Sequence, residues 1–188
     1  MIQDDDLTET TLSSETVFDG NLLHVLRDNA RLPNGHQSMR EFIVHPGAVI
    51  VIPVLPNGNL LLERQFRYPL KQVFIELPAG KIDPNEDILV TGQRELLEET
   101  GYTARRWDYV AKQHPCIGYS NEVIHIYLAR DLSAGEHRRD EDEHLQLFDA
   151  SLPDCLRMVR DGRITDGKTI IALFWAEKVL QGSWPLDT

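Results

Sequence analysis

Three glutamates stand close together in this 188-residue chain and restrict what their segment can form. Glu95, Glu98 and Glu99 are three and four positions apart, and such positions share one face of an α-helix. Like charges on that face repel, at a cost of roughly a few tenths of a kcal/mol per pair on an exposed helix. A divalent cation reverses the sign, and carboxylate oxygens suit Mg²⁺ or Mn²⁺. The spacing therefore predicts a metal-binding helix face; the alternative is a solvated acidic face.

The neighbouring residues predict where this helix begins and ends. Asp83 and Pro84 form a start signal, with Asp83 as the cap, Pro84 at the first helical position and Glu86 three residues after the cap. Gly101 follows the last helical residue, where glycine adopts a left-handed conformation at little cost. Gly92 inside the helix costs about 1 kcal/mol relative to alanine, so we expect the helix to pack closely against another segment.

The segment 80–102 resembles the Nudix box. The family pattern is a glycine, five residues, a glutamate, seven residues, and then Arg-Glu-apolar-any-Glu-Glu-any-Gly-apolar. The chain meets every position of this pattern with Gly80, Glu86, Arg94, Glu95, Leu96, Glu98, Glu99, Gly101 and Tyr102. A match at fixed spacing over so many positions is a strong signal.

The resemblance implies a role for each polar position of the box. The implied ligands of Mg²⁺, with Mn²⁺ as a possible substitute, are the side chains of Glu86, Glu95, Glu98 and Glu99 and the carbonyl of Ala79. Glu98 and Glu99 are also implied to be catalytic, because the ions they hold activate water in the family. Arg94 is implied to orient a box carboxylate by a salt bridge rather than to touch the substrate.

Segments outside the box resemble the ADP-ribose pyrophosphatase branch of this family. Arg67 matches a phosphate-binding arginine, although Arg64 and Arg67 fall on opposite faces of a regular strand. The implied substrate-binding residues are Arg64, Arg67, Glu76, Gly118, Ser120 and, for stacking on a base, Phe18. The alternatives are an ordinary strand-end arginine, a plain strand-end breaker at Pro115 and a core role for Phe18.

An acidic run at residues 140–143 precedes an apolar strand that begins at Leu145. In ADP-ribose pyrophosphatases a loop at this place carries a glutamate that helps to bind metal or to orient water. The resemblance makes Glu141 and Glu143 candidate catalytic residues, and we favour Glu143 because it is nearer the strand. The alternative is a solvated charge run.

Composition excludes several classes of protein. A net charge of −11 argues against general nucleic-acid binding, which requires a basic surface. Cys116 and Cys155 have no metal-binding spacing, and the histidines suggest no zinc site. The first residues are acidic and polar, and no apolar run approaches the ~20 residues of a membrane span. We therefore expect no signal peptide, no membrane partner and a cytoplasmic location.

Turn signals and apolar runs divide the chain into two expected parts. Residues 1–45 are expected to form a small antiparallel sheet, with strands near 15–18, 22–27 and 39–44 and a frayed segment 1–14. Residues 46–188 are expected to form an α/β domain. Its expected strands are 48–55, 60–67, 74–79, 106–113, 123–129 and 145–148, with a hairpin turn at 56–59, a charged loop at 131–143 and helices at 151–160 and 169–180.

The family resemblance, which covers about residues 46–180, implies an α/β/α sandwich with a mixed sheet. It also implies that the N-terminal sheet serves dimerisation, which predicts a homodimer. The predicted function is Mg²⁺-dependent hydrolysis of a nucleoside diphosphate linked to another group, with ADP-ribose giving AMP and ribose 5-phosphate. The alternatives are another nucleotide sugar, such as ADP-glucose or GDP-mannose, and a non-catalytic nucleotide sensor.

Overall fold

The computed structural model describes residues 7–135 and 144–186, and the chain divides into two compact units. One unit contains the chain up to His45 together with the loop 116–122. The other contains residues 46–115 and the chain from Val123 onward. No helix within the described ranges combines the length and apolar character needed to cross a bilayer.

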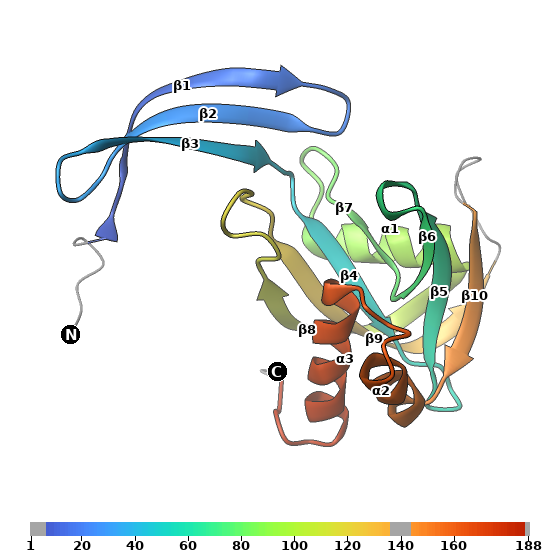
Figure 1. Ribbon diagram of the computed structural model, residues 1–188. Coiled ribbons are helices and arrows are strands. Elements are labelled where there is room, and N and C mark those ends of the chain that lie inside the picture. Colours follow the sequence, from blue (N-terminus) through green and yellow to red (C-terminus); the bar gives the residue numbers. More distant parts are fainter. Residues whose placement is uncertain (1–6, 136–143, 187–188) are drawn as a thin grey trace. The chain divides into compact units, whose positions relative to one another are not determined.

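The first unit is built on a three-stranded antiparallel sheet in the order β1-β2-β3, whose strands are Thr10–Asp19, His24–Arg31 and Gln37–Val44 (Figure 1). The expectation that the chain is frayed up to Ser14 is wrong from Thr10 onward. Thr10 pairs with Arg31 on β2, and Glu9 beside it binds Arg40 on β3 at 2.7 Å, so long-range partners order this end of the strand. The loop 116–122 joins the unit through a bridge between Ser120 and Ile43.

The second unit contains two sheets and three α-helices within its described residues. One sheet has the order β7-β4-β9-β8 and is mixed, because β4 and β9 are parallel while the other neighbours are antiparallel. The other sheet has the order β10-β5-β6 and is antiparallel. The elements are β4 (Ala48–Pro53), β5 (Leu60–Arg67), β6 (Gln72–Glu76), β7 (Ala79–Lys81), α1 (Ile88–Thr100), β8 (Tyr102–Gln113), β9 (Ile124–Ala134), β10 (Leu145–Ala150), α2 (Leu152–Arg160) and α3 (Gly167–Leu180).

The expected return hairpin between β4 and β5 forms only at its turn. Val54 and Leu60 make an isolated antiparallel bridge, after which β5 pairs with β6 and β10 instead. Both edges of β4 are already occupied by β7 and β9, so β5 has no free edge of β4 to extend along. The charged loop expected from Asp131 also begins later, since β9 continues to Ala134 past a left-handed Asp131.

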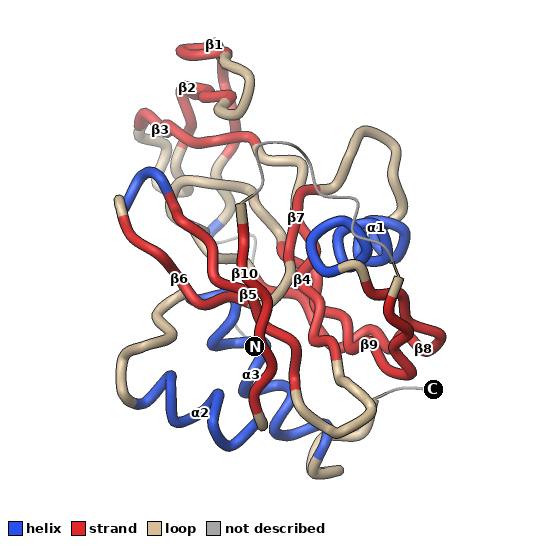
Figure 2. Tube along the Cα trace, turned by 90° about the vertical axis from the view of Figure 1, so that its right-hand side faces the viewer, coloured by secondary structure: helices blue, strands red, loops and turns tan. Residues whose placement is uncertain are grey.

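Strand β4 lies between two helical layers, as Figure 2 shows for the strands between α1 and the pair α2 and α3. Its side chains alternate between two apolar clusters. Val51 packs in the cluster that contains Leu96 of α1, and Ile50 packs in the cluster that contains Leu173 of α3. All six residues of β4 are buried, as expected for a strand covered on both faces. The predicted α/β/α sandwich with a mixed sheet and a small N-terminal antiparallel sheet is confirmed.

The helix that carries the glutamates begins later than its start signal suggests. Asp87 caps α1 by accepting from the Leu89 backbone at 2.8 Å, and Asp83 and Pro84 lie outside the helix. The reason is Asn85, whose left-handed φ of 64° interrupts any helix begun at Pro84. At the other end the prediction is confirmed, because Gly101 has a φ of 74° and its amide donates to the Leu97 carbonyl.

The predicted close packing at Gly92 is also confirmed. A Cβ added there would stand 3.2 Å from Cγ1 of Val49 and 3.4 Å from Cζ3 of Trp107. The missing side chain lets α1 approach the sheet.

Replacing Gly92 with leucine should therefore destabilise the protein. Overpacking of this kind costs about 1–3 kcal/mol, and the gain in helix propensity of about 1 kcal/mol offsets only part of it. Urea denaturation measures the change in unfolding free energy. The matched control is Val90→Leu at an exposed position of the same helix, which should change stability by less than about 0.5 kcal/mol. Equal stability of the two variants would contradict the packing argument.

Candidate functional site

Arg94 lies at the centre of the acidic face of α1. Its Nε and Nη2 donate to the two carboxylate oxygens of Glu86 at 3.0 and 2.9 Å. Its Nη1 donates to Glu95 at 2.7 Å and to Glu98 at 3.0 Å, and Nη2 also reaches the Lys81 carbonyl at 3.0 Å. One guanidinium thus holds three carboxylates together and ties them to the strand that precedes the helix.

Glu86 is held by three hydrogen-bond donors. Hydrogen bonds from Arg94, from the Thr91 hydroxyl and from the Asp83 amide lower the pKa of Glu86 to about 2. The carboxylate is therefore ionised throughout the physiological range. Glu86 lies in the turn before α1 rather than in the helix. It accepts from Nε and Nη2 of Arg94, whereas Glu98 accepts from Nη1.

Gly80 leaves the space that the Glu95 carboxylate fills. A Cβ on Gly80 would stand 1.9 Å from Oε1 of Glu95, closer than any real contact, so a side chain at this position would displace the carboxylate. Glu95 is 8% exposed. The missing side chain of Gly80 thus makes room for the carboxylate of Glu95, although the two residues are distant in sequence.

Glu99 connects the helix to the segment that leads into the box. It is 3% exposed, and its Oε2 accepts from the Ala79 amide at 3.0 Å. The carbonyl of the preceding Pro78 accepts from Val51 on β4 at 2.9 Å. These two bonds fix the backbone of the lead-in segment 77–79 between α1 and the sheet.

The donor set of this face suits a hard divalent cation, because it consists of carboxylate and carbonyl oxygens. In residues 7–135 and 144–186, no three acidic, histidine or cysteine side chains converge as the ligands of one ion would. The glutamates instead direct oxygens to Arg94 and to the Ala79 amide. The residue types fit a metal, and the space left by Gly80 is what lets the Glu95 carboxylate lie beside the lead-in strand.

A second group of buried charges lies on the strands next to the lead-in segment. Arg67 donates from Nε and Nη2 to the Glu76 carboxylate at 2.7 and 2.8 Å. Lys168 of α3 also donates to Glu76, and Glu63 stands opposite Glu76 on the paired strand. Hydrogen bonding to Glu76 raises the pKa of Arg67 despite burial, and the negative charges of Glu63 and Glu99 act in the same direction.

Sequence reasoning missed Glu63 and Lys168. Glu63 follows three leucines in a buried strand, and only the sheet pairing brings it opposite Glu76. Lys168 did leave a signal: it lies in the first turn of a helix, where the helix dipole disfavours a cation. A lysine there needs carboxylates nearby, and the structure supplies Glu76 and Asp166.

The structure separates the two arginines of the segment 64–67. The pairing of β5 with β6 and β10 runs without a bulge, so Arg64 and Arg67 lie on opposite faces of the strand. Arg64 shares its face with Gln146, to which it donates at 3.4 Å. Of the two, Arg67 alone is brought next to Glu76.

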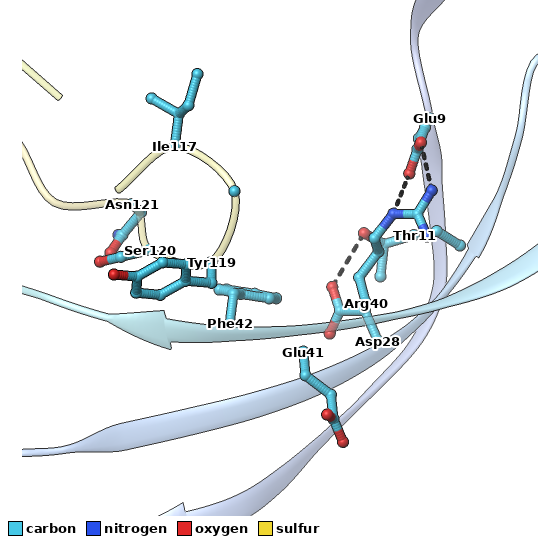
Figure 3. A pocket seen from close by; sticks show the side chains of 12 residues that line it. Glu9, Thr11, Asp28, Arg40, Glu41, Phe42, Ile117, Tyr119, Ser120 and Asn121 are labelled. Atoms are coloured by element: carbon cyan, nitrogen blue, oxygen red, sulfur yellow. Dashed lines mark hydrogen bonds and ion pairs between the residues drawn. The ribbon is translucent and has the colours of Figure 1, made fainter. Parts of the chain in front are cut away.

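Gly118 and Ser120 line a hollow of about 310 Å³ within the first unit. Figure 3 shows loop residues Tyr119, Ser120 and Asn121 on one side of it and the ion pair of Arg40 with Glu9 on the other. The lining thus combines an aromatic ring with hydrogen-bonding groups.

The remaining sequence predictions concern Phe18, Glu141 and Glu143. Phe18 is on β1, more than half exposed, with its ring over Gly20, so it is not a core residue. Glu141 and Glu143 lie outside the residues that the structure describes.

The comparisons with known proteins agree with this geometry. Residues 44–164 match a family described as the NUDIX domain, and residues 9–43 match the nucleoside diphosphate sugar hydrolase N-terminal domain. The chain is 38% identical over 169 residues to an ADP-ribose pyrophosphatase of Bacillus subtilis, covering 89% of this chain and 91% of the relative. It is also 38% identical over 167 residues to a methanol dehydrogenase activator of Bacillus methanolicus, covering 88% and 90%.

More distant similarities extend the range of substrates among the relatives. A GDP-mannose pyrophosphatase of Yersinia enterocolitica is 33% identical over 143 residues, covering 70% of this chain and 73% of the relative. Among solved structures, a crystal structure of an ADP compounds hydrolase superposes with a TM-score of 0.84 at 26% identity, covering 93% of this chain and 95% of the other.

Replacing Gly80 with alanine should weaken divalent-cation binding without unfolding the protein. The new Cβ would displace the end of one flexible side chain, Glu95, and reorienting metal-site groups typically costs about 10–100-fold in affinity. Calorimetric titration with Mn²⁺ measures the affinity, and urea denaturation checks the fold. Gly167→Ala is the control, since a Cβ there meets nothing within 4 Å. Unchanged Mn²⁺ affinity in Gly80→Ala would remove Glu95 from the candidate ligands.

Proposed function

Since this chain belongs to the Nudix hydrolase family and is a pyrophosphohydrolase, we propose that it hydrolyses ADP-ribose to AMP and ribose 5-phosphate. The support for this substrate is the ADP-ribose pyrophosphatase among its relatives, which matches nearly the whole chain. The N-terminal match to a nucleoside diphosphate sugar hydrolase domain points to the same substrate class.

The observation that carries the proposal is the acidic face of α1, gathered by one arginine and backed by a glycine. Glu95, Glu98 and Glu99 would hold Mg²⁺, with Mn²⁺ as a substitute, and Glu86 and the Ala79 carbonyl would support them. A divalent cation held there neutralises charge on the diphosphate and lowers the pKa of a bound water. Arg94 keeps the carboxylates together when no cation does so.

Arg67 is the residue we propose for binding the diphosphate. Its guanidinium is oriented by two hydrogen bonds to Glu76, and its side chain remains 40% exposed. A guanidinium matches phosphate oxygens in a bidentate manner. Arg64 faces the other side of the strand, so we assign it no direct contact with the same phosphates.

The remaining sequence predictions keep their proposed roles. We propose that Glu143, with Glu141 as the alternative, orients or deprotonates the attacking water. Gly118 and Ser120 are proposed substrate contacts, because the hollow they line offers hydrogen bonds and the Tyr119 ring for a ribose or a base. Phe18 is a proposed stacking residue, and its exposure leaves the ring available.

Another nucleotide sugar is the second candidate substrate, favoured by the identity to a GDP-mannose pyrophosphatase. The acidic face handles only the diphosphate, which ADP-ribose, ADP-glucose and GDP-mannose share. We do not propose the non-catalytic sensor, because every carboxylate of the box is retained and the matching family is one of hydrolases.

We also propose that the N-terminal sheet pairs with a second copy of the chain. All ten residues of β1 are exposed, and the sheet presents apolar side chains to solvent that a soluble protein normally covers. The exposed large apolar residues of this sheet and its turns are Leu12, Val17, Phe18, Leu22, Leu23 and Met39. A symmetric contact between two such sheets would bury those of these side chains that do not bind substrate, Leu12 and Val17 among them.

The substrate is tested with a panel of ADP-ribose, ADP-glucose and GDP-mannose in Mg²⁺, following monoester release with a coupled alkaline phosphatase. We expect the highest kcat/KM with ADP-ribose and no turnover when EDTA removes the metal. Glu99→Gln keeps the shape of a buried acceptor but removes one charge, so kcat should fall by at least about 100-fold. A near wild-type rate in Glu99→Gln would show that Glu99 is not a metal ligand. A higher kcat/KM with ADP-glucose or GDP-mannose would mean that ADP-ribose is not the preferred substrate.

Dimerisation is tested by light scattering after size-exclusion chromatography. The wild-type protein should have the mass of a dimer, and the double variant Leu12→Glu/Val17→Glu should have the mass of a monomer, because buried unpaired charges disfavour association. Val90→Glu changes an equally exposed valine on α1 and should remain dimeric. A monomeric wild type, or a dimeric double variant, would contradict the proposed role of the sheet.

A further inference from the structure

Lys168 occupies a position that an isolated lysine would not favour. It is the second residue of α3, where the helix dipole repels a cation, and its side chain is only 17% exposed. Burying an ammonium costs several kcal/mol unless carboxylates compensate for it. Two carboxylates do so: Lys168 donates to Glu76 and, at 3.0 Å, to Asp166.

Glu76 is shared between Lys168 and Arg67. The carboxylate is 2% exposed and accepts both bonds of the Arg67 fork as well as the bond from Lys168. Burial alone would raise the pKa of Glu76, but the two cations outweigh it and hold the pKa below its ordinary value. Glu76 therefore stays ionised and links β5, on which Arg67 lies, to α3.

The first turn of α3 is itself fixed to the segment that follows Glu76. The buried hydroxyl of Thr169 accepts from the Leu77 amide at 3.0 Å. Asp166 caps the helix by accepting from the Thr169 amide at 3.0 Å, and the same carboxylate oxygen accepts from Lys168. The backbone from which Lys168 reaches Glu76 is therefore fixed by hydrogen bonds on both sides.

We propose that Lys168 is a positioning residue for the pyrophosphohydrolase reaction, which holds the Glu76 carboxylate so that Glu76 can orient Arg67. Without the ammonium, the carboxylates of Glu76 and Asp166 would face each other with like charge, and Glu76 would turn away. The guanidinium of Arg67 would then lose the carboxylate that orients it. This inference rests on the proposed contact of Arg67 with the diphosphate.

The test compares kinetic constants for ADP-ribose hydrolysis in Mg²⁺. Lys168→Met removes the charge at similar length and should lower kcat/KM by about 10–100-fold, since small misplacements at a site have effects of that size. The loss should fall mainly on KM, because Arg67 binds the diphosphate in the ground state and the transition state alike. Lys168→Arg should restore most of the activity, since a guanidinium can bridge the same two carboxylates.

The matched control is Lys178→Met, which removes the half-buried lysine at the other end of the same helix and should leave both constants unchanged. Urea denaturation of each variant separates loss of fold from loss of position. If Lys168→Met does not fold, Lys168→Arg still decides the matter, because it must then restore KM together with stability. An unchanged KM in folded Lys168→Met would overturn the proposal.

A double-mutant cycle distinguishes positioning from direct contact with substrate. In a Glu76→Gln background, Lys168→Met should raise KM no further, because the carboxylate through which it acts is gone. Effects that multiply would mean that Lys168 touches the substrate itself, which would also overturn the proposal. Arg67→Met is the reference: if it leaves KM unchanged, the assigned phosphate contact fails independently of Lys168.

Discussion

The structure depends on how its buried carboxylates are compensated. Removing a charge from water costs several kcal/mol per ion, and a buried carboxylate persists only with cations or amide donors around it. Among the described residues, the buried glutamates are Glu63, Glu76, Glu95 and Glu99. The structure offsets them with two cationic centres, one around Arg94 and one around Arg67 and Lys168. Arg94 holds Glu95, Arg67 and Lys168 hold Glu76, and the Ala79 amide holds Glu99, so the acidic side chains form a defined surface.

The lead-in segment 77–79 lies between Glu76, which Arg67 and Lys168 bind, and Lys81, whose carbonyl Arg94 binds; each residue of the segment is held by a different element. The Leu77 amide donates to Thr169 of α3, the Pro78 carbonyl accepts from Val51 of β4, and the Ala79 amide donates to Glu99 of α1. Both helical layers and the sheet between them therefore fix one short piece of backbone. The rigidity suits the proposed site, in which a backbone carbonyl and several carboxylates would bind a cation, since misplacement by about 1 Å is costly.

Much of this arrangement follows from local spacing and was predictable. The glutamate spacing on α1 and the glycine that ends the helix are properties of residues within one or two turns of each other, and a glycine inside a helix indicated the close packing at Gly92. The alternation of Arg64 and Arg67 across β5 follows from the two-residue period of a strand. The predicted start of α1 was wrong, because both Asp83 and Asp87 can cap a helix. The left-handed backbone of Asn85 prevents a helix from beginning at Asp83, so Asp87 is the cap.

The sequence by itself determined the acidic helix face, its family and the order of strands and helices, because periodicity and short-range signals encode them. Only the tertiary structure decided that β5 pairs away from β4, that Glu63 stands opposite Glu76, and that Lys168 of α3 binds Glu76. Those contacts join residues far apart in the chain, and their energies depend on burial and on which strand edge remains free. Burial and the availability of a strand edge are set only when the layers pack, so they could not be predicted from neighbouring residues in the sequence.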